Sequence, residues 1–204
     1  MNYILPLIIG FLAAFVGLLA PSMLNMTAAR TSIEKGKKAG IQFAAGAASV
    51  VFIQGFIAVT FAKYLVANPD VITKLKTTAI FVLFGLSIFF FMQARKKFKA
   101  EGKDKKGSSY ITGLGMSSLN MLAIPFYLAM ATLAESKGWM TIEQPYSTIY
   151  VIGAVLGAFS LFALYASFAE IIAKKAQFIA KNINYILSVL FIVLAISTAI
   201  QVFG

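Results

Sequence analysis

Residues 4–29 read ILPLIIGFLAAFVGLLAPSMLNMTAA, a stretch with no charged side chain that Pro21 interrupts near its end. A helix needs about 20 predominantly apolar residues to cross the hydrocarbon core of a bilayer. The stretch therefore predicts a first transmembrane helix. A proline inside a helix removes one main-chain hydrogen bond and frees a carbonyl oxygen, so we expect this span to be broken or kinked at Pro21.

The composition of the whole chain agrees with a membrane protein. Of its 204 residues, 60% are hydrophobic and 12% are charged, whereas a soluble domain is about half apolar and a quarter charged. The chain contains no Cys and no His. This excludes disulfides, thiol redox chemistry, zinc sites built on Cys or His, and His-based catalytic triads. Without a nucleophile–base pair we expect no enzyme, no metal and no cofactor.

Six apolar stretches are separated by charged or turn-rich segments. The expected spans are residues 4–29, 39–65, 77–94, 110–134, 146–172 and 183–203. Six spans would use about 120 residues, which leaves no room for a separate soluble domain. We therefore expect an all-α polytopic membrane protein with a single transmembrane domain over residues 1–204. Its first half covers about 1–94, a basic loop about 95–109, and its second half about 110–204.

The basic residues are unevenly distributed between the two sides. Fourteen of the 18 lie in the loops after the first, third and fifth spans. The positive-inside rule makes these loops cytoplasmic and places both termini outside a cytoplasmic (inner) membrane. The net charge of +11 then reflects orientation. We expect anionic lipid to contact these loops, and no nucleic acid to bind.

A short motif occurs twice. Ser22–Met26 reads SMLNM and Ser117–Met121 reads SSLNM, identical at four of five positions. Each copy lies in the first span of a three-span half, and three is odd, so the halves cross the membrane in opposite senses. The motif predicts two inverted three-helix repeats, an architecture of secondary transporters. Chance similarity between two short segments is the alternative.

Each copy also lies near a proline, Pro21 in the first half and Pro125 in the second. Matching helix breaks in two halves point to a substrate site. An amide left in hydrocarbon is costly, so buried amides should face another helix or a cavity. The predicted substrate-binding residues are Pro21, Ser22, Asn25, Gln54, Ser117, Ser118 and Asn120. For the serines, hydrogen bonding between helices is the alternative role.

Two carboxylates and one glycine pattern lead to further predictions. Glu34 and Glu170 lie near the cytoplasmic boundary and are candidates for ion coupling, although Glu170 could instead pair with Lys174 one helical turn later. The Gly153-x-x-x-Gly157 pattern in the fifth span predicts a close helix contact, either within the protein or across a homodimer.

Two segments resemble a known family. Leu19 to Gly46 reads LAPSMLNMTAARTSIEKGKKAGIQFAAG and resembles the first signature of the LysE/RhtB amino-acid exporters, a Pro-Gly-Pro turn followed by a Gly-basic-basic-Ala-Gly loop and a later glycine. Pro21 matches the first proline, and residues 36–40 match the loop. Leu119 to Ala129 is similar to the family's Asn-Pro-Lys segment, with Asn120 on its asparagine. Ser22 and Met23 replace Gly-Pro, and Met121 and Leu122 replace Pro-Lys, so an intramembrane lysine that could meet a carboxylate is missing.

The resemblance implies export of amino acids or related small metabolites, driven by the proton gradient. The residues themselves predict a secondary transporter of a small polar solute that works by alternating access. The alternative is a membrane-embedded accessory or scaffold subunit that transports nothing, since the glycine patterns and basic loops would serve such a protein equally well.

Overall fold

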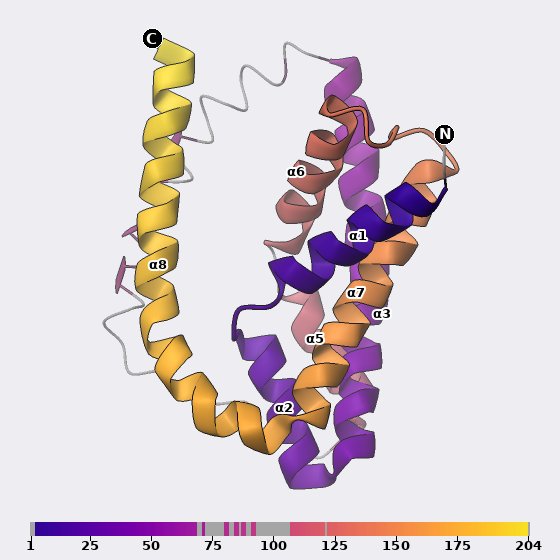
Figure 1. Ribbon diagram of the computed structural model, residues 1–204, viewed down its shortest axis with the longest axis vertical. Helices are drawn as coiled ribbons and strands as arrows, with labels where there is room; N and C mark the ends of the chain where they lie inside the picture. The colour runs from indigo at the N-terminus through magenta and orange to yellow at the C-terminus, as the bar shows by residue number, and fades with distance from the viewer. Residues whose placement is uncertain are drawn as a thin grey trace. The chain divides into compact units, whose positions relative to one another are not determined.

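The structure is a computed structural model that describes residues 3–68, 71, 80–81, 84–85, 87–88, 91–92, 107–120 and 122–203 (Figure 1). Within residues 173–184, 186–187 and 201–203 it describes the helix but not the side chains. Every regular element of the described residues is a helix. The helices are α1 (Ile4–Gly17), α2 (Met23–Lys35), α3 (Lys37–Ala67), α5 (Ser109–Ser118), α6 (Ala123–Ser136), α7 (Tyr146–Ser167) and α8 (Ala169–Phe203).

The chain divides into two compact units. Unit 1 comprises Met1–Tyr64 and Ala100–Lys174, and unit 2 comprises Leu65–Lys99 and Lys175–Gly204. The units do not coincide with the predicted halves, because unit 1 takes the first two predicted spans of each half and unit 2 takes the third. The single domain over residues 1–204 stays a prediction.

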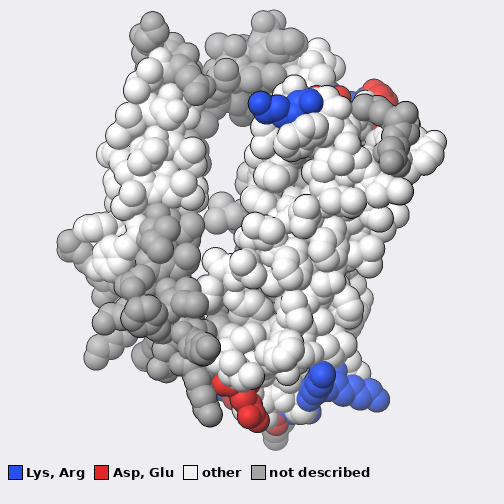
Figure 2. All heavy atoms as spheres, viewed as in Figure 1, with Lys and Arg blue, Asp and Glu red and all other residues white. Residues whose placement is uncertain are grey.

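Two of the helices, α3 and α7, are long and apolar enough to cross a membrane. A third span results if α5 and α6 form one span, bent by 69° at the residues between them. The helix α1 and the stretch Ser188–Ile200 of α8 are apolar but shorter. Most of the predicted third span, 77–94, lies outside the described residues. The structure is thus that of an all-helical membrane protein, with charged side chains at the two ends of unit 1 and an uncharged surface between them (Figure 2).

The first predicted span consists of two helices, because α1 ends at Gly17 and α2 begins at Met23. We call residues 18–22 the first break. The fourth predicted span is likewise interrupted between α5 and α6, and we call its described residues 119, 120 and 122 the second break. Pro21 lies in the first break, as expected. Pro125 lies in the first turn of α6, where the missing N–H would have no partner within the helix anyway, so Pro125 does not make the second break.

The helix α1 lies against α7 at three glycines. A methyl group at Gly10 would overlap the carbonyl oxygen of Tyr150, and one at Gly153 would overlap the carbonyl oxygen of Leu7. Gly157 meets the main chain of α1 in the same way. Small residues let two helix backbones approach closely, which favours packing in a lipid environment. Of the two roles considered for the Gly153-x-x-x-Gly157 pattern, the structure shows the contact within the protein.

The helix α5 lies against α3 through the same kind of contact. A methyl group at Gly113 would overlap the carbonyl oxygen of Phe43, and one at Gly46 would overlap the carbonyl oxygen of Tyr110. Each first span therefore packs closely on the second span of the other half. These contacts bring both helix breaks into one bundle, and Figure 1 shows both breaks about midway along the length of α3.

Candidate functional site

The first break is held by Asn25, which is fully buried near the start of α2. Its Nδ2 group donates to the main-chain oxygens of Leu18 at 2.6 Å and Ala20 at 2.9 Å. Ser22 precedes the helix, and its Oγ accepts from the main-chain N–H of Asn25 at 3.4 Å. A Ser at this position is a common N-cap. Asn25 thus folds back onto the carbonyls that the end of α1 leaves free.

The third main-chain carbonyl of this break, that of Leu19, accepts a hydrogen bond from α7. The hydroxyl of Tyr165, on α7, donates to the main-chain oxygen of Leu19 at 2.8 Å. Tyr165 is 7% exposed. Free carbonyls at a helix end must be satisfied in a membrane, and here the main-chain oxygens of residues 18–20 all have a donor. Tyr165 was not predicted as a site residue. Its only signal in the sequence is a hydroxyl in an apolar span.

The second break is held by Gln54, which lies on α3 and is 5% exposed. Its Nε2 group donates to the main-chain oxygens of Ser117 at 3.1 Å and Asn120 at 3.3 Å. The side chain therefore bridges the end of α5 and the start of the connection to α6. The two breaks are built alike, because in each a buried side-chain amide donates to two main-chain carbonyls.

Each of these amides also has an oxygen without a partner. Asn25 Oδ1 and Gln54 Oε1 are buried and accept no hydrogen bond within the protein. Leaving a buried polar atom unpaired costs about 1–3 kcal/mol, and native structures contain few such atoms. Both unpaired atoms at the breaks are acceptors, and both lie on residues that the sequence had predicted as site residues.

The other predicted site residues are placed differently. Pro21 is half-buried, and Ser22 is exposed. Ser117 is buried and Asn120 half-buried, and both contribute main-chain oxygens to the second break. Ser118 is exposed, and its Oγ donates to the main-chain oxygen of Leu114 in its own helix at 2.9 Å. The structure thus brings Gln54 to Ser117 and Asn120, and Asn25 to Ser22.

The two predicted coupling residues are both exposed. Glu34 forms an ion pair with Arg30, one turn earlier on α2, with Oε1 2.6 Å from Nε. Glu170 lies in the first turn of α8. The side chain of Lys174 lies outside the described residues, so the predicted Glu170–Lys174 pair does too. Within the described part of the chain, no three Asp, Glu, His or Cys residues are grouped as metal ligands would be.

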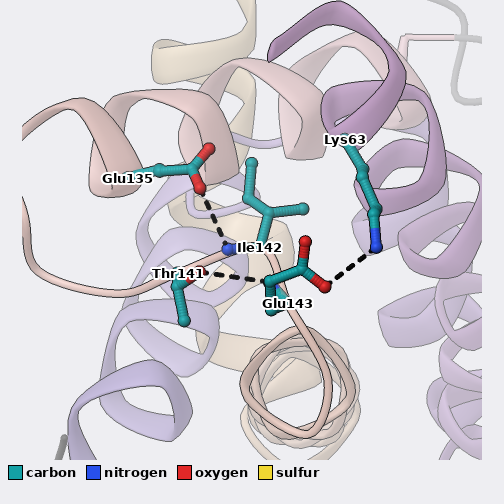
Figure 3. A network of polar contacts seen from close by, with 5 residues as sticks. All are labelled: Lys63, Glu135, Thr141, Ile142 and Glu143. Atoms are coloured by element: carbon teal, nitrogen blue, oxygen red, sulfur yellow. Dashed lines mark hydrogen bonds and ion pairs between the residues drawn. The ribbon is translucent and has the colours of Figure 1, made fainter. Parts of the chain in front are cut away.

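A third carboxylate, Glu135, was not singled out from the sequence. It lies in the last turn of α6, and its Oε1 accepts from the main-chain N–H of Ile142 at 3.3 Å (Figure 3). Its Oε2 is buried without a partner. Nearby, Lys63 and Glu143 form an exposed ion pair at 2.8 Å. In the sequence, Glu135 resembles any charge at the end of an apolar span. Its role in holding the α6–α7 loop depends on a main-chain contact that only the fold shows.

Comparisons with known proteins assign the chain to a family. The profile of the LysE type translocators matches residues 15–202, a range that includes both breaks and almost the whole chain. No curated protein and no solved structure matches significantly. The match agrees with the resemblance found in the two sequence segments, and it extends to the apolar helices on both sides of them. The chain therefore belongs to the LysE type translocator family and is a membrane transporter.

Proposed function

We propose that this transporter exports amino acids or related small polar metabolites across the cytoplasmic membrane by alternating access. Family membership supports transport, and the resemblance to the LysE/RhtB exporters implies the solute class and the outward direction. The pair of buried breaks supports a solute site within unit 1, because interrupted helices of this kind supply polar main-chain groups at membrane depth.

We further propose that six spans form two inverted three-helix halves. The close contacts of unit 1 support this arrangement, because they correspond pairwise. Residues of α1 and their counterparts in α5 are separated by one constant interval, and those of α3 and α7 by another. The corresponding residues are Leu7 and Tyr110, Gly10 and Gly113, Phe43 and Tyr150, and Gly46 and Gly153.

One observation carries the mechanism. The second predicted span of each half donates to the break in the other half. Gln54, on α3, binds the carbonyl of Ser117, and Tyr165, on α7, binds the carbonyl of Leu19. A movement of one half against the other must therefore rearrange both breaks together. Such coupling supports alternating access, in which one repeat moves against the other around the site.

The proposal includes orientation and energy source. The basic loops would face the cytoplasm, and both termini would lie outside. Transport would be driven by the proton gradient, with Glu34 or Glu170 as the coupling residue. Replacing each by Gln in turn should remove the dependence of export on the pH gradient if that residue couples transport. Export that keeps its pH dependence in both variants would rule out these two residues.

Reconstitution into lipid vesicles tests the function. Purified protein should export labelled amino acids from loaded vesicles. Asn25→Ala and Asn120→Ala should abolish export while the protein still inserts. Tyr165→Phe removes one hydrogen bond to a break and should lower the rate about tenfold, since such bonds contribute about 1–3 kcal/mol when buried. Tyr185→Phe, at an exposed tyrosine of α8, is the matched control and should export normally.

Two results would contradict the proposal. Undiminished export by both asparagine variants would show that the solute binds elsewhere. Absence of flux from protein reconstituted alone, combined with co-purification of a stoichiometric partner, would favour the accessory or scaffold subunit.

A further inference from the structure

The unpaired oxygens of Asn25 and Gln54 each lie near main-chain acceptors. An amide carries its oxygen and its nitrogen on the same carbon atom. Because Asn25 Nδ2 binds the main-chain oxygens of Leu18 and Ala20, Asn25 Oδ1 lies close to these oxygens. In the same way, Gln54 Oε1 lies close to the main-chain oxygens of Ser117 and Asn120. Each break therefore contains a cluster of oxygen atoms, one of which has no donor.

Each break lies between two helix ends. The helices α1 and α5 reach the breaks with their C-terminal ends, where the carbonyl dipoles place partial negative charge, and α2 and α6 begin there with the partial positive charge of an N-terminal end. No charged residue occurs in 1–29, 39–62, 107–134 or 146–169. The helices that build the breaks thus offer no Lys or Arg to bind a carboxylate, and no carboxylate to neutralise a cation before the solute arrives.

We propose that Asn25 Oδ1 and Gln54 Oε1 accept hydrogen bonds from the ammonium group of the transported solute, and that binding does not require a carboxylate on that solute. This inference rests on the proposed function and restricts the transported solutes to primary amines, with or without a carboxylate. A primary ammonium group has three N–H donors and no acceptor, which complements a cluster of oxygens with one unused acceptor. A carboxylate would face the same oxygens with like charge.

The burial of the two amides supports this role. Asn25 is fully buried and Gln54 is 5% exposed, so bulk water does not satisfy their oxygens in the described conformation. Their nitrogen atoms are fixed by two main-chain carbonyls each, which sets the direction of the oxygens before any solute binds. Such fixed acceptors lower the ordering cost of binding a donor.

Matched compounds test the inference in the purified full-length protein. Leucine and serine are compared with their decarboxylated analogues 3-methylbutylamine and ethanolamine, and with their deaminated analogues 4-methylpentanoate and 3-hydroxypropanoate, which carry no amine. A ligand that binds the folded state raises the unfolding temperature. For at least one set we expect the amine to raise it as much as the amino acid does, at equal concentration. The deaminated compound of that set should have less than a tenth of the amino acid's affinity.

Variants connect the binding to the two oxygens. Gln54→Met should weaken binding of the amine at least tenfold. Gln42→Met is the matched control, because Gln42 lies on the same helix but is exposed, and it should bind normally. Asn25→Leu should weaken binding in the same way. If Asn25→Leu does not fold, Gln54→Met alone decides the test, provided that it unfolds cooperatively in the absence of ligand.

The outcomes separate the inference from the function on which it rests. Binding of an amino acid and its deaminated acid without the amine would overturn the inference and leave amino-acid export intact. So would normal amine binding by Gln54→Met. Stabilisation by NaCl or KCl but not by choline chloride, without any response to amines, would assign the oxygens to an inorganic cation and overturn it as well. No response to any of these compounds, together with no flux in vesicles, would overturn both proposals.

Discussion

The side-chain amide of Gln54 donates to the main-chain carbonyl of Ser117 across 3.1 Å, and so joins the middle of α3 to the end of α5. The two residues belong to different predicted halves. The end of a helix inside a membrane leaves carbonyls that lipid cannot satisfy. At the second break, Gln54 adds a second donor to carbonyls that already accept the main-chain N–H of Asn120 and of Ala123.

Removal of this bridge should destabilise the protein. Gln54→Met keeps the length of the side chain but removes its two hydrogen bonds to the carbonyls of Ser117 and Asn120, which then keep only their main-chain donors. We expect a loss of about 1–3 kcal/mol in the free energy of unfolding, measured by thermal unfolding in detergent. Gln42→Met changes the same residue type at an exposed position of α3 and should alter stability by less than about 0.5 kcal/mol. Equal effects of the two substitutions would contradict the structural role of Gln54.

Two glycines of α5 should respond in opposite ways to alanine. A methyl group at Gly113 would overlap the carbonyl oxygen of Phe43, whereas one at Gly115 would meet nothing within 4 Å. Gly113→Ala should lower the free energy of unfolding by about 1–3 kcal/mol or more, because the main chain of α3 cannot move aside as a flexible side chain can. Gly115→Ala should stabilise the helix by about 0.5–1 kcal/mol. Unfolding curves of the two variants check this directly, and destabilisation by Gly115→Ala alone would mean that α5 presents its opposite face to α3.

Unit 2 contains a reciprocal pair of serines. Ser87 Oγ donates to the main-chain oxygen of Ser188, and Ser188 Oγ donates to that of Ser87, both at 3.0 Å. Hydrogen bonds between membrane helices contribute about 0.6 kcal/mol on average. Ser87→Ala and Ser188→Ala each remove one hydroxyl donor and should each lower the free energy of unfolding by about 0.6 kcal/mol. Thr198→Val, which removes a bond within α8, is the control for loss of a hydroxyl that contacts its own helix. Unchanged stability of both serine variants would argue against the pair.

The loop between α6 and α7 should depend on Glu135 more than on Glu143. Glu135→Ala leaves the buried N–H of Ile142 without an acceptor, which should cost about 1–3 kcal/mol. Glu143→Ala removes only an exposed ion pair with Lys63, whose side chain is 60% exposed, and such pairs contribute about 0–1 kcal/mol. Thermal unfolding of the two variants gives the comparison. A larger loss from Glu143→Ala would reverse our ranking of the two contacts.

Much of the first break could be predicted from the sequence. Pro21 marks its position, and a buried amide such as Asn25 is costly enough in an apolar span to indicate a specific role. The same reasoning identified Gln54, but not its partners. Those depend on how α3 lies against α5, which is set by Gly46 and Gly113 and cannot be read from a single span.

The two copies of the repeated motif lie at different places relative to the helix breaks, which the sequence alone did not predict. The first copy runs from Ser22, the last residue of the first break, into α2, whereas in the second copy Ser117 and Ser118 end α5 and Leu119 and Asn120 lie in the second break. The two copies thus lie on different sides of their breaks, because a helix ends where partners for its free carbonyls exist. Adjacent serines also separate by helix rotation, which buries Ser117 and exposes Ser118. Tyr165 was missed because an aromatic residue in an apolar span is ordinary unless the carbonyl that it reaches is known.

The glycine contacts of unit 1 also constrain how the chain is made. The partner of α1 is α7 and the partner of α3 is α5. Both early helices therefore lack their partners until the ribosome has synthesised the second half of the chain. Until then, the glycine-lined faces of α1 and α3 are available to lipid or to chaperones of the insertion machinery. A chain released after the first half would lack both partners, and quality-control proteases should remove it. Supplying the second half as a separate polypeptide should protect it.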